Sequence, residues 1–320
     1  MTMANWTVSD IPSQHGRTAV ITGTGGLGFE GALALAHAGA TVIIAGRNPS
    51  RGAAAVERIR QSAAGADVSF AELDLASLDS IRAFAKRLGD SHNSLDLLIN
   101  NAGVMTPPQR QETADGFELQ FGTNHLGHFA LTAQLLPLLR KGDQPRVVSV
   151  SSIAARQGAI DLNDLQSARS YKPMVAYSQS KLACLMFALE LHRRSHAAGW
   201  GIQSIAAHPG IARTELLPNG AGKWSAAGSA RRFLWFLFQP VAQGALPTLF
   251  AATSQHAEGG AYYGPDQLGE TRGQPTLAKT PLQALDQGMA RRLWKESERL
   301  TGMAFPLPAL RAQKPYQLFQ

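Results

Sequence analysis

ITGTGGLGFEGALALAHAGA, residues 21–40, begins like an apolar strand, passes through four glycines and continues as an alanine-rich helix. Within this stretch, Gly23, Gly25 and Gly28 match the pattern G-x-G-x-x-G. A strand, a glycine turn and a helix N-terminus form an anion site, because exposed backbone N–H groups and the positive helix end face a pyrophosphate. The same spacing also fits a tight turn that binds nothing, so residues elsewhere in the chain must decide between the two.

Strand-like and helix-like segments alternate along the first 210 residues. Short β-branched runs are each followed by a helical stretch, which is typical of a parallel sheet covered on both faces. Right-handed crossovers would then place a ligand crevice at the C-terminal ends of the strands. The expected strands span residues 18–23, 41–46, 68–75, 95–103, 146–152 and 201–210, and the expected helices include residues 49–63, 77–89, 113–138 and 175–196.

These elements predict an α/β protein, a single doubly wound Rossmann domain with a parallel sheet over residues 1–320. No linker rich in glycine, serine or proline divides the first 210 residues. We expect a core over residues 17–215 and an extended C-terminal region, residues 216–320, that forms a substrate lid or a packing element. In that region residues 230–254 are strongly apolar, residues 259–275 are rich in turn formers, and residues 284–302 predict a late amphipathic helix.

Composition narrows the possible partners. The net charge is +7, but the basic residues occur in ones and twos without interleaved aromatics, so we expect a solvated surface and no nucleic acid partner. No stretch approaches the roughly 20 apolar residues of a membrane span, and the N-terminus lacks the pattern of a signal peptide. The single cysteine, Cys184, allows no internal disulfide, and we expect a cytoplasmic protein.

The motif Tyr177-Ser-Gln-Ser-Lys181 lies in a predicted helix. A spacing of four residues places both side chains on one helix face, about one turn apart. A cation beside a phenol lowers the tyrosine pKa from its usual value of about 10, which suits a proton donor and acceptor near neutral pH. The alternative is an ordinary exposed helix pair.

Polar residues also follow two predicted strands. Ser152 ends one of them, where its hydroxyl could hold a substrate oxygen or simply cap a turn or helix. Asn100-Asn101-Ala102-Gly103 ends another, and Asn124 follows downstream in TNHLGHF. The alternative for these amides is turn chemistry and a buried hydrogen bond.

Taken together and in this order, these residues resemble the short-chain dehydrogenase/reductase family over residues 17–215. The resemblance implies that Tyr177 is the general acid/base, and that Lys181 lowers the pKa of that tyrosine and holds the nicotinamide ribose. It also implies that Ser152 orients the substrate carbonyl and that Asn124 holds a water in the proton relay.

The resemblance further implies the residues that line the cofactor site. Asp74 and Leu75 would face the adenine, Asn101, Ala102 and Gly103 the adenosine ribose, and the segment HPGIART the nicotinamide. The glycine turn is one residue shorter than the family pattern, because only Thr24 and Gly25 separate Gly23 from Gly26-Leu27-Gly28. We expect cofactor binding to survive, with altered contacts to the adenosine phosphates. The full expected set is Gly23, Thr24, Gly25, Gly26, Leu27, Gly28, Arg47, Asn48, Asp74, Leu75, Asn101, Ala102, Gly103, Tyr177, Lys181, Pro209, Gly210, Ile211 and Thr214.

The end of the second strand predicts the form of the cofactor. Enzymes that use NAD place an acidic residue there to accept the ribose 2′-hydroxyl, whereas an arginine favours a 2′-phosphate. Here the strand ends Ala45-Gly46-Arg47-Asn48, with Arg51 just beyond and no acid nearby. An arginine fork pairs well with phosphate, so we expect NADP(H) over NAD(H), the alternative being that Arg47 is only surface charge.

Other segments indicate the substrate class. Between Ser152 and Tyr177 lie 24 residues, about twice the usual family gap. This insert, the phrases TNHLGHFALT, AYSQSKLA and RLWKESERLTG, and the long C-terminal part resemble the retinol-dehydrogenase-like and protochlorophyllide-reductase-like branch, whose members handle apolar carbonyls or alcohols. The run 233–238 fits a lid over such a substrate, a core or dimer helix, or a shallow membrane contact.

The sequence therefore predicts an NADP(H)-dependent oxidoreductase that interconverts a carbonyl and an alcohol on an apolar substrate. The alternatives are reduction of a C=C bond and a non-catalytic NADP(H)-binding sensor. No metal site is expected, since His125, His128 and His208 have no evident carboxylate or thiol partner. We also expect a homo-oligomer, as in many family members.

Overall fold

The computed structural model describes residues 5–212 and 239–306. Within them, eight strands form one sheet in the order β3-β2-β1-β4-β5-β6-β7-β8, in which β8 alone runs antiparallel to its neighbour. The predicted α/β class with a doubly wound parallel sheet is confirmed. The strands are β1 Thr18–Thr22, β2 Thr41–Gly46, β3 Val68–Glu72, β4 Leu97–Asn100, β5 Arg146–Val150, β6 Gln203–Ala207, β7 Tyr262–Gln267 and β8 Arg272–Leu277.

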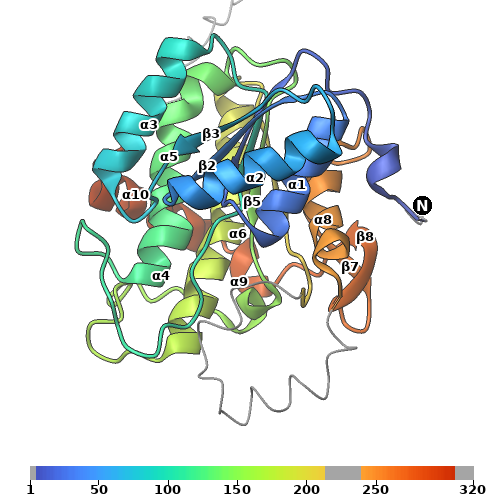
Figure 1. Ribbon diagram of the computed structural model, residues 1–320. Helices are drawn as coiled ribbons and strands as arrows, with labels where there is room; N and C mark the ends of the chain where they lie inside the picture. Colours follow the sequence, from blue (N-terminus) through green and yellow to red (C-terminus); the bar gives the residue numbers. More distant parts are fainter. Residues whose placement is uncertain (1–4, 213–238, 307–320) are drawn as a thin grey trace, which may run out of the picture.

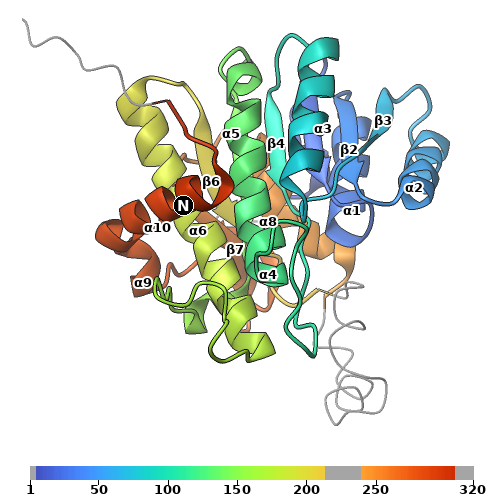
Figure 2. The ribbon, with the colours of Figure 1, turned by 90° about the vertical axis from the view of Figure 1, so that its left-hand side faces the viewer.

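Helices cover both faces of the sheet (Figures 1 and 2). One face packs against α1, α2 and α8 around residues such as Ile21, Leu35 and Phe250. The other packs against α3, α5, α6 and α10 around Phe129, Phe187 and Trp294. The helices are α1 Gly26–His37, α2 Pro49–Ser62, α3 Leu78–Ser91, α4 Leu119–Phe121, α5 Gly127–Leu139, α6 Pro173–Ala198, α8 Val241–Thr253, α9 Leu282–Leu285 and α10 Gln287–Thr301, with short helices η1 Val8–Asp10, η2 Gly122–Leu126 and η3 Ile153–Gln157.

The strand order explains where a ligand can bind. The chain runs outward from β1 to β2 and β3, and then returns to the other side of β1 with β4. The loops after β1 and β4 therefore leave the sheet in opposite directions and open a crevice at the carboxyl ends of the strands. Gly23 follows β1 and Asn101 follows β4, so both lie at this switch point.

One sequence expectation about local structure is wrong, and two strands were not expected. The continuous helix expected over residues 113–138 is broken: a turn closes Thr113 onto Phe117, the buried Glu118 caps α4, and residues 122–126 form a π-helix before α5. The turn-rich residues 259–275 contain strand β7 and the start of β8, which form an antiparallel hairpin. Their glycines and prolines hid these strands. Pro275 lies in the edge strand β8, where proline is tolerated, and Pro265 lies at the irregularity in the pairing of β7 with β8.

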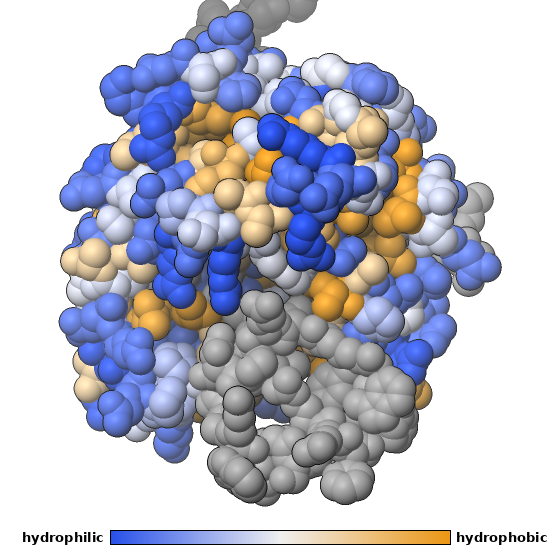
Figure 3. Space-filling model, viewed as in Figure 1, coloured by the Kyte–Doolittle hydropathy of each residue, from blue (hydrophilic) through white to orange (hydrophobic). Residues whose placement is uncertain are grey.

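On the face shown in Figure 3, hydrophilic residues predominate and apolar ones lie between them in small areas. No helix within residues 5–212 and 239–306 is long and apolar enough to cross a membrane.

Candidate active site

The glycine turn after β1 is shaped by close contact with its own helix. Gly23 and Gly26 have φ angles of +100° and +53°, which favour glycine. A Cβ atom on Gly28 would collide with the carbonyl oxygen of Gly23, so the first turn of α1 lies directly on the end of β1. By contrast, no atom of the described residues lies within 4 Å of a Cβ on Gly25, the N-cap of this twelve-residue helix. Among the described residues, therefore, none crowds this helix N-terminus, and its N–H groups stay accessible as an anion site requires.

Thr22 joins the glycine turn to the segment after β4. Its hydroxyl oxygen accepts hydrogen bonds from the backbone N–H groups of Asn101 and Ala102, both at 2.9 Å. The Asn101 side chain donates in return to the Thr22 carbonyl at 2.7 Å. Asn101 and Ala102, both expected to line the adenosine ribose, are thus held against the end of β1 at the switch point.

His128 extends this connection to Asn124, and its tautomer follows from its partners. Its Nδ1 lies 2.9 Å from the Asn124 carbonyl oxygen, which can only accept, so Nδ1 carries the proton. Its Nε2, 3.0 Å from the Thr22 hydroxyl, is therefore the acceptor, and Thr22 is the donor. Burial lowers the pKa of His128 to about 4, so the ring is neutral near pH 7. One chain of hydrogen bonds runs from Asn101 through Thr22 and His128 to Asn124.

Asn124 sits in the π-helix η2, and its side-chain amide makes three hydrogen bonds inside the protein. Its Oδ1 accepts from Val104 N at 2.8 Å, and its Nδ2 donates to the Val104 carbonyl and to Ser180 Oγ at 3.0 and 2.9 Å. The wider turn of a π-helix frequently occurs at functional sites. Asn124 thereby fastens the segment after β4 to α6, which carries the predicted acid/base pair.

Tyr177 and Lys181 lie in the N-terminal half of α6, and both are at least nine-tenths buried. The Lys181 Nζ lies 6.0 Å from the centre of the Tyr177 ring and donates to the Val150 carbonyl, at the end of β5, at 3.0 Å. In return, the Ser151 hydroxyl donates to the Lys181 carbonyl at 2.7 Å. The spacing of four residues does place both side chains on one face, and that face is turned toward the sheet rather than toward solvent.

Ser152 follows β5 and is the N-cap of η3. Its Oγ accepts from Ala154 N at 3.2 Å, so the capping role open to it in the sequence is present. A serine hydroxyl has two acceptor lone pairs and one proton, and this contact leaves the proton available to a ligand. The C-cap of η3, Gly158, passes so close to α6 that a Cβ would collide with the Ser178 carbonyl. The serine segment is therefore packed directly on the helix that carries Tyr177.

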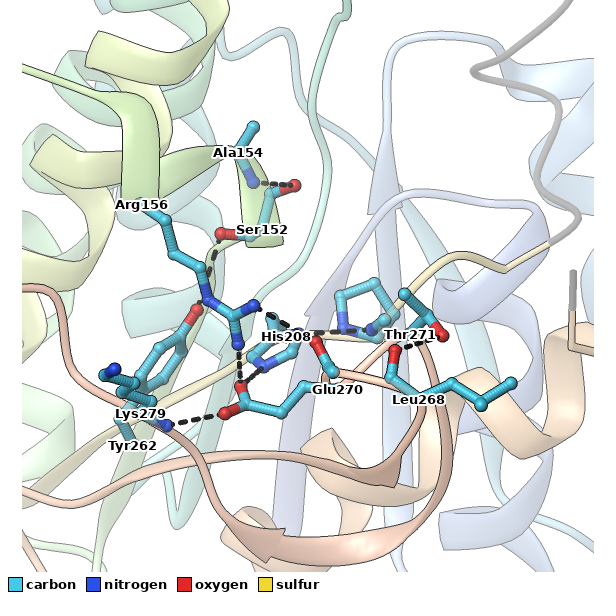
Figure 4. A network of polar contacts seen from close by, with 12 residues as sticks. Ser152, Ala154, Arg156, His208, Tyr262, Leu268, Glu270, Thr271 and Lys279 are labelled. Carbon is cyan, nitrogen blue, oxygen red and sulfur yellow. Dashed lines mark hydrogen bonds and ion pairs between the residues drawn. The ribbon is translucent and has the colours of Figure 1, made fainter. Parts of the chain in front are cut away.

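A second tyrosine, Tyr262 in β7, also belongs to this site. Its hydroxyl donates to the Ser152 carbonyl at 3.4 Å, and its ring lies 5.1 Å from that of His208 (Figure 4). Burial raises the pKa of Tyr262, so its phenol stays protonated near neutral pH. Tyr262 therefore supports the serine segment as a donor.

The segment after β6 holds the residues expected near the nicotinamide. Gly210 has a φ of +63° and lies against the Thr271 carbonyl, where a Cβ would collide. Ile211 N donates to the same carbonyl at 2.8 Å, and the Gln239 side chain donates to the Pro209 carbonyl at 2.5 Å. Pro209, Gly210 and Ile211 thus lie on the hairpin of β7 and β8.

The residues expected at the adenine end lie at the edges of β2 and β3. Thr24 lies over Gly46, where a Cβ would contact the Thr24 methyl group. Arg47 follows β2 and is exposed, whereas the Asn48 side chain caps α2 by accepting from Arg51 N at 3.0 Å. Asp74 accepts from Ala76 N at 2.9 Å, and Leu75 is buried against Gly127.

Some expectations concern residues outside those that the structure describes. Thr214 and the run 233–238 fall between residues 212 and 239. Over the described ranges, no three His, Cys, Asp or Glu side chains are grouped to hold a metal ion. His125 and His128, which share one stretch of helix, reach different partners, since His125 contacts Ser297 Oγ of α10.

Sequence reasoning missed the connecting residues Thr22, His128 and Tyr262. Each is polar and at least nine-tenths buried, and buried polar groups need partners. A histidine inside the apolar run GHFALT was a usable signal, but its partner Thr22 lies 106 positions away.

Comparison with known proteins places the chain in a family. A model of the short chain dehydrogenase family matches residues 17–222. Polyprenol dehydrogenase of Mus musculus is 42% identical over 300 residues, covering 91% of this chain and 86% of that protein. Retinol dehydrogenase 13 of Homo sapiens is 39% identical over 297 residues, with coverage of 91% and 86%.

Solved structures agree on the fold. The crystal structure of an uncharacterised protein from Mycobacterium paratuberculosis is 42% identical, with a TM-score of 0.78 and coverage of 94% of this chain and 99% of that one. RhlG of Pseudomonas aeruginosa, solved as a complex with NADP, is 24% identical, with a TM-score of 0.63 and coverage of 78% and 94%. On its sequence, fold and relatives, the chain belongs to the short-chain dehydrogenase family, in its retinol-dehydrogenase-like branch.

Proposed function

We propose that this protein is an NADP(H)-dependent oxidoreductase that interconverts a carbonyl and an alcohol on an apolar substrate, with Tyr177 as general acid/base. The observation that carries the proposal is the buried pair of Tyr177 and Lys181, with Nζ 6.0 Å from the ring centre, beside Asn124 and the serine segment. General acid–base catalysis needs a proton donor that is held in position, and α6 holds both side chains.

The residues present fit a dinucleotide. No described residue crowds the N-terminus of α1 at Gly25, and the fixed segment after β4 faces the same crevice. The shortened turn keeps these features with one residue fewer than the family pattern. When bound, the nicotinamide supplies the hydride chemistry, and the protein positions and protonates.

The internal hydrogen bonds of these side chains leave specific protons free, and these protons define the role that we propose for each residue. Tyr177 gives its proton to the substrate oxygen during reduction and takes one during oxidation. The free proton of Ser152 donates to that oxygen and orients it. Lys181 has three N–H donors, and its bond to Val150 leaves two for the cofactor ribose or a water. Asn124 holds the segment after β4 against α6.

The preference for NADP(H) rests on Arg47. This arginine follows β2 on the exposed side, close to the turn residue Thr24 through Gly46, and no acidic side chain lies among residues 46–51. A 2′-phosphate at this edge would pair with a guanidinium, whereas a ribose hydroxyl would find no carboxylate to accept its proton.

Its relatives support an apolar substrate. The similar proteins carry the names of dehydrogenases for retinol and polyprenol, which are long unsaturated alcohols. We therefore propose a prenyl-like or retinoid-like alcohol, or the matching aldehyde, as the substrate class of this chain.

Fluorescence titration of NADPH and NADH tests the cofactor assignment. Wild-type protein should bind NADPH more tightly by about tenfold or more, and Arg47→Ala should lose that preference, since one phosphate pair contributes roughly 1.5–3 kcal/mol. Arg82→Ala on α3, where the arginine pairs with Asp79, is the matched control and should keep the preference. Equal affinities of the wild type for both cofactors would contradict the assignment.

A further inference from the structure

The carboxylate of Glu270, at the tip of the hairpin of β7 and β8, contacts two active-site segments at once (Figure 4). Its Oε2 forms an ion pair with Arg156 Nη2 at 2.5 Å and accepts a hydrogen bond from His208 Nε2 at 3.0 Å. Its Oε1 accepts from Lys279 N at 2.9 Å. Arg156 belongs to η3, which begins after Ser152, and His208 directly precedes the segment expected at the nicotinamide.

The bond to His208 also fixes that ring. Gly210 N donates to His208 Nδ1 at 3.2 Å, so Nδ1 is the acceptor and Nε2 must carry the proton that Glu270 receives. The His208 side chain is 1% exposed, and a Cβ on Gly264 would collide with the ring, so the ring has no room to shift on that side. Glu270 thereby sets the orientation of a ring that holds the backbone of Gly210.

The second arm of Glu270 reaches the serine segment. Arg156 donates from Nη1 to the Gly269 carbonyl at 3.1 Å and forms an ion pair through Nη2 with the Glu270 carboxylate, so its guanidinium spans the hairpin tip. η3 runs for only five residues between its caps Ser152 and Gly158. A displacement of Arg156 is therefore transmitted to the N-cap over one short helix.

The hairpin tip adopts a backbone that its residues do not favour. Leu268, Gly269 and Glu270 have φ angles of 48°, 67° and 70°, in the left-handed region that costs non-glycine residues conformational energy. Such conformations persist where the surroundings hold them, and they concentrate at functional sites. Here the strained turn is what brings the Glu270 carboxylate onto Arg156 and His208.

The charge of Glu270 suits these contacts. Burial acts to raise its pKa, but the hydrogen bonds from His208 and Lys279 N and the positive charge of Arg156 together hold the pKa below its usual value. The carboxylate is thus ionised near neutral pH, where it accepts two hydrogen bonds and pairs with Arg156. The Glu270–Arg156 pair also forms one wall of an open hollow of about 440 Å³ beside Lys279 and Leu282.

We propose that Glu270 is a positioning residue, which holds the Ser152 segment and the segment of residues 209–211 in the relative geometry that hydride transfer needs. This inference rests on the proposed function, because it assigns Ser152 to the substrate side and residues 209–211 to the nicotinamide side. Glu270 touches neither reactant itself; it acts through Arg156 and His208.

Glu270→Gln tests the proposal with little change in size. The measurement is the single-turnover rate of hydride transfer to an aldehyde that the wild type reduces, per NADPH-binding site counted by titration. We expect a rate lower by about ten- to a hundredfold, as for small misplacements of reacting groups, with the number of sites and the NADPH affinity within about threefold of wild type. An unchanged rate per site would overturn the proposal.

Asp266→Asn is the matched control on the same hairpin. Asp266 is exposed and accepts from Gln274 N at 2.8 Å, so it supports the hairpin without touching either segment. Its variant should keep the wild-type rate. Adding Arg156→Met to Glu270→Gln should slow the reaction no further than the more severe single variant does, and additive losses would overturn the proposed shared path.

Hydrogen exchange separates this proposal from the proposed function. Glu270→Gln should speed exchange at the amides of Gly210, Ile211 and Ala154, which the network holds, and Asp266→Asn should not. If the wild type reduces no carbonyl, the proposed function fails. Unchanged hydrogen exchange in Glu270→Gln would in that case overturn the positioning role as well. If the wild type reduces the aldehyde and Glu270→Gln reduces it at the same rate per site, only the positioning role is contradicted.

Discussion

Lys181 Nζ lies 6.0 Å from the centre of the Tyr177 ring and is fastened to the Val150 carbonyl at 3.0 Å. This bond orders a long side chain that would otherwise sample many rotamers. It also ties α6 to the end of β5, the strand that leads into Ser152. The three predicted catalytic side chains on these elements are therefore placed by one hydrogen-bonded junction between helix and sheet.

Tyr177→Phe removes the proposed proton donor without a change in ring size. We expect kcat to fall by about 10²–10⁴-fold with NADPH affinity nearly unchanged, because the hydroxyl acts in the chemical step. The control is Tyr262→Phe, which removes the other buried phenol of the site and should cost less, since Tyr262 only supports the Ser152 backbone. Equal losses in steady-state assays of the two variants would contradict the assignment of the acid/base.

Thr22→Val tests the hydrogen-bond chain between the two sides of the crevice. Valine keeps the shape but leaves the N–H groups of Asn101 and Ala102 and the Nε2 of His128 without their partner. We expect the free energy of unfolding to drop by about 2–4 kcal/mol, because buried groups lose their bonds. Urea denaturation measures this. Thr22→Ser retains the hydroxyl and should stay closer to wild type; a valine variant as stable as wild type would show that the chain contributes nothing.

Acid should destabilise the protein through its buried histidines. Burial lowers the pKa of His125 to about 3 and that of His128 to about 4, against about 6.5 in the unfolded chain. Both folded pKa values are depressed, so the stability is fully present above pH 6.5. It falls as the pH drops toward 4, because the unfolded chain then binds the extra protons. Each histidine contributes a slope of up to about 1.4 kcal/mol per pH unit.

Urea denaturation between pH 7 and pH 4.5 measures this slope. Burial also lowers the pKa of His208, so it adds to the slope in the same direction. His128→Gln should reduce the slope of the unfolding free energy against pH by up to about 1.4 kcal/mol per pH unit, the contribution of one proton, whatever its effect on stability at pH 7. A variant with the wild-type slope would mean that His128 is charged in the folded protein.

Gly28→Ala and Gly25→Ala form a matched pair in the shortened glycine turn. A Cβ at residue 28 would collide with the Gly23 carbonyl, whereas no described residue lies within 4 Å of one at residue 25. We expect Gly28→Ala to lower the melting temperature and abolish NADPH binding. Gly25→Ala should fold normally but bind NADPH more weakly, because its methyl group enters the space before α1. Unaltered NADPH affinity in Gly25→Ala would place the phosphates elsewhere.

The sequence predicted the fold well because local patterns determine it. Apart from residues 113–138, the β-branched runs and following helices up to residue 207 match the observed elements to within a few residues, and the glycine turn identified the switch point. The prediction was wrong where tertiary contacts override local preference. The Glu118 cap and the π-helix break the expected helix over residues 113–138, and the hairpin of β7 and β8 pairs across Pro265 and Pro275.

The sequence predicted only those parts of the site whose residues lie close together in a motif. Tyr177 and Lys181 are four residues apart, so their relation is visible in the sequence. The role of Thr22 depends on His128, 106 residues away, and that of Glu270 on Arg156 and His208, which are 114 and 62 residues away. Pairings of this kind appear only once the sheet brings the ends of β1, β5, β6 and β7 to one edge.

The most direct test of the central claim follows the transferred hydride. The protein is incubated with NADPH deuterated at C4 and an α,β-unsaturated apolar aldehyde such as retinal, and the label in the product is located by NMR. Our account predicts deuterium on the carbinol carbon of the alcohol and about 10²–10⁴-fold slower labelling with Tyr177→Phe. Deuterium on a carbon of the former C=C bond, or labelling that Tyr177→Phe leaves unchanged, would contradict it.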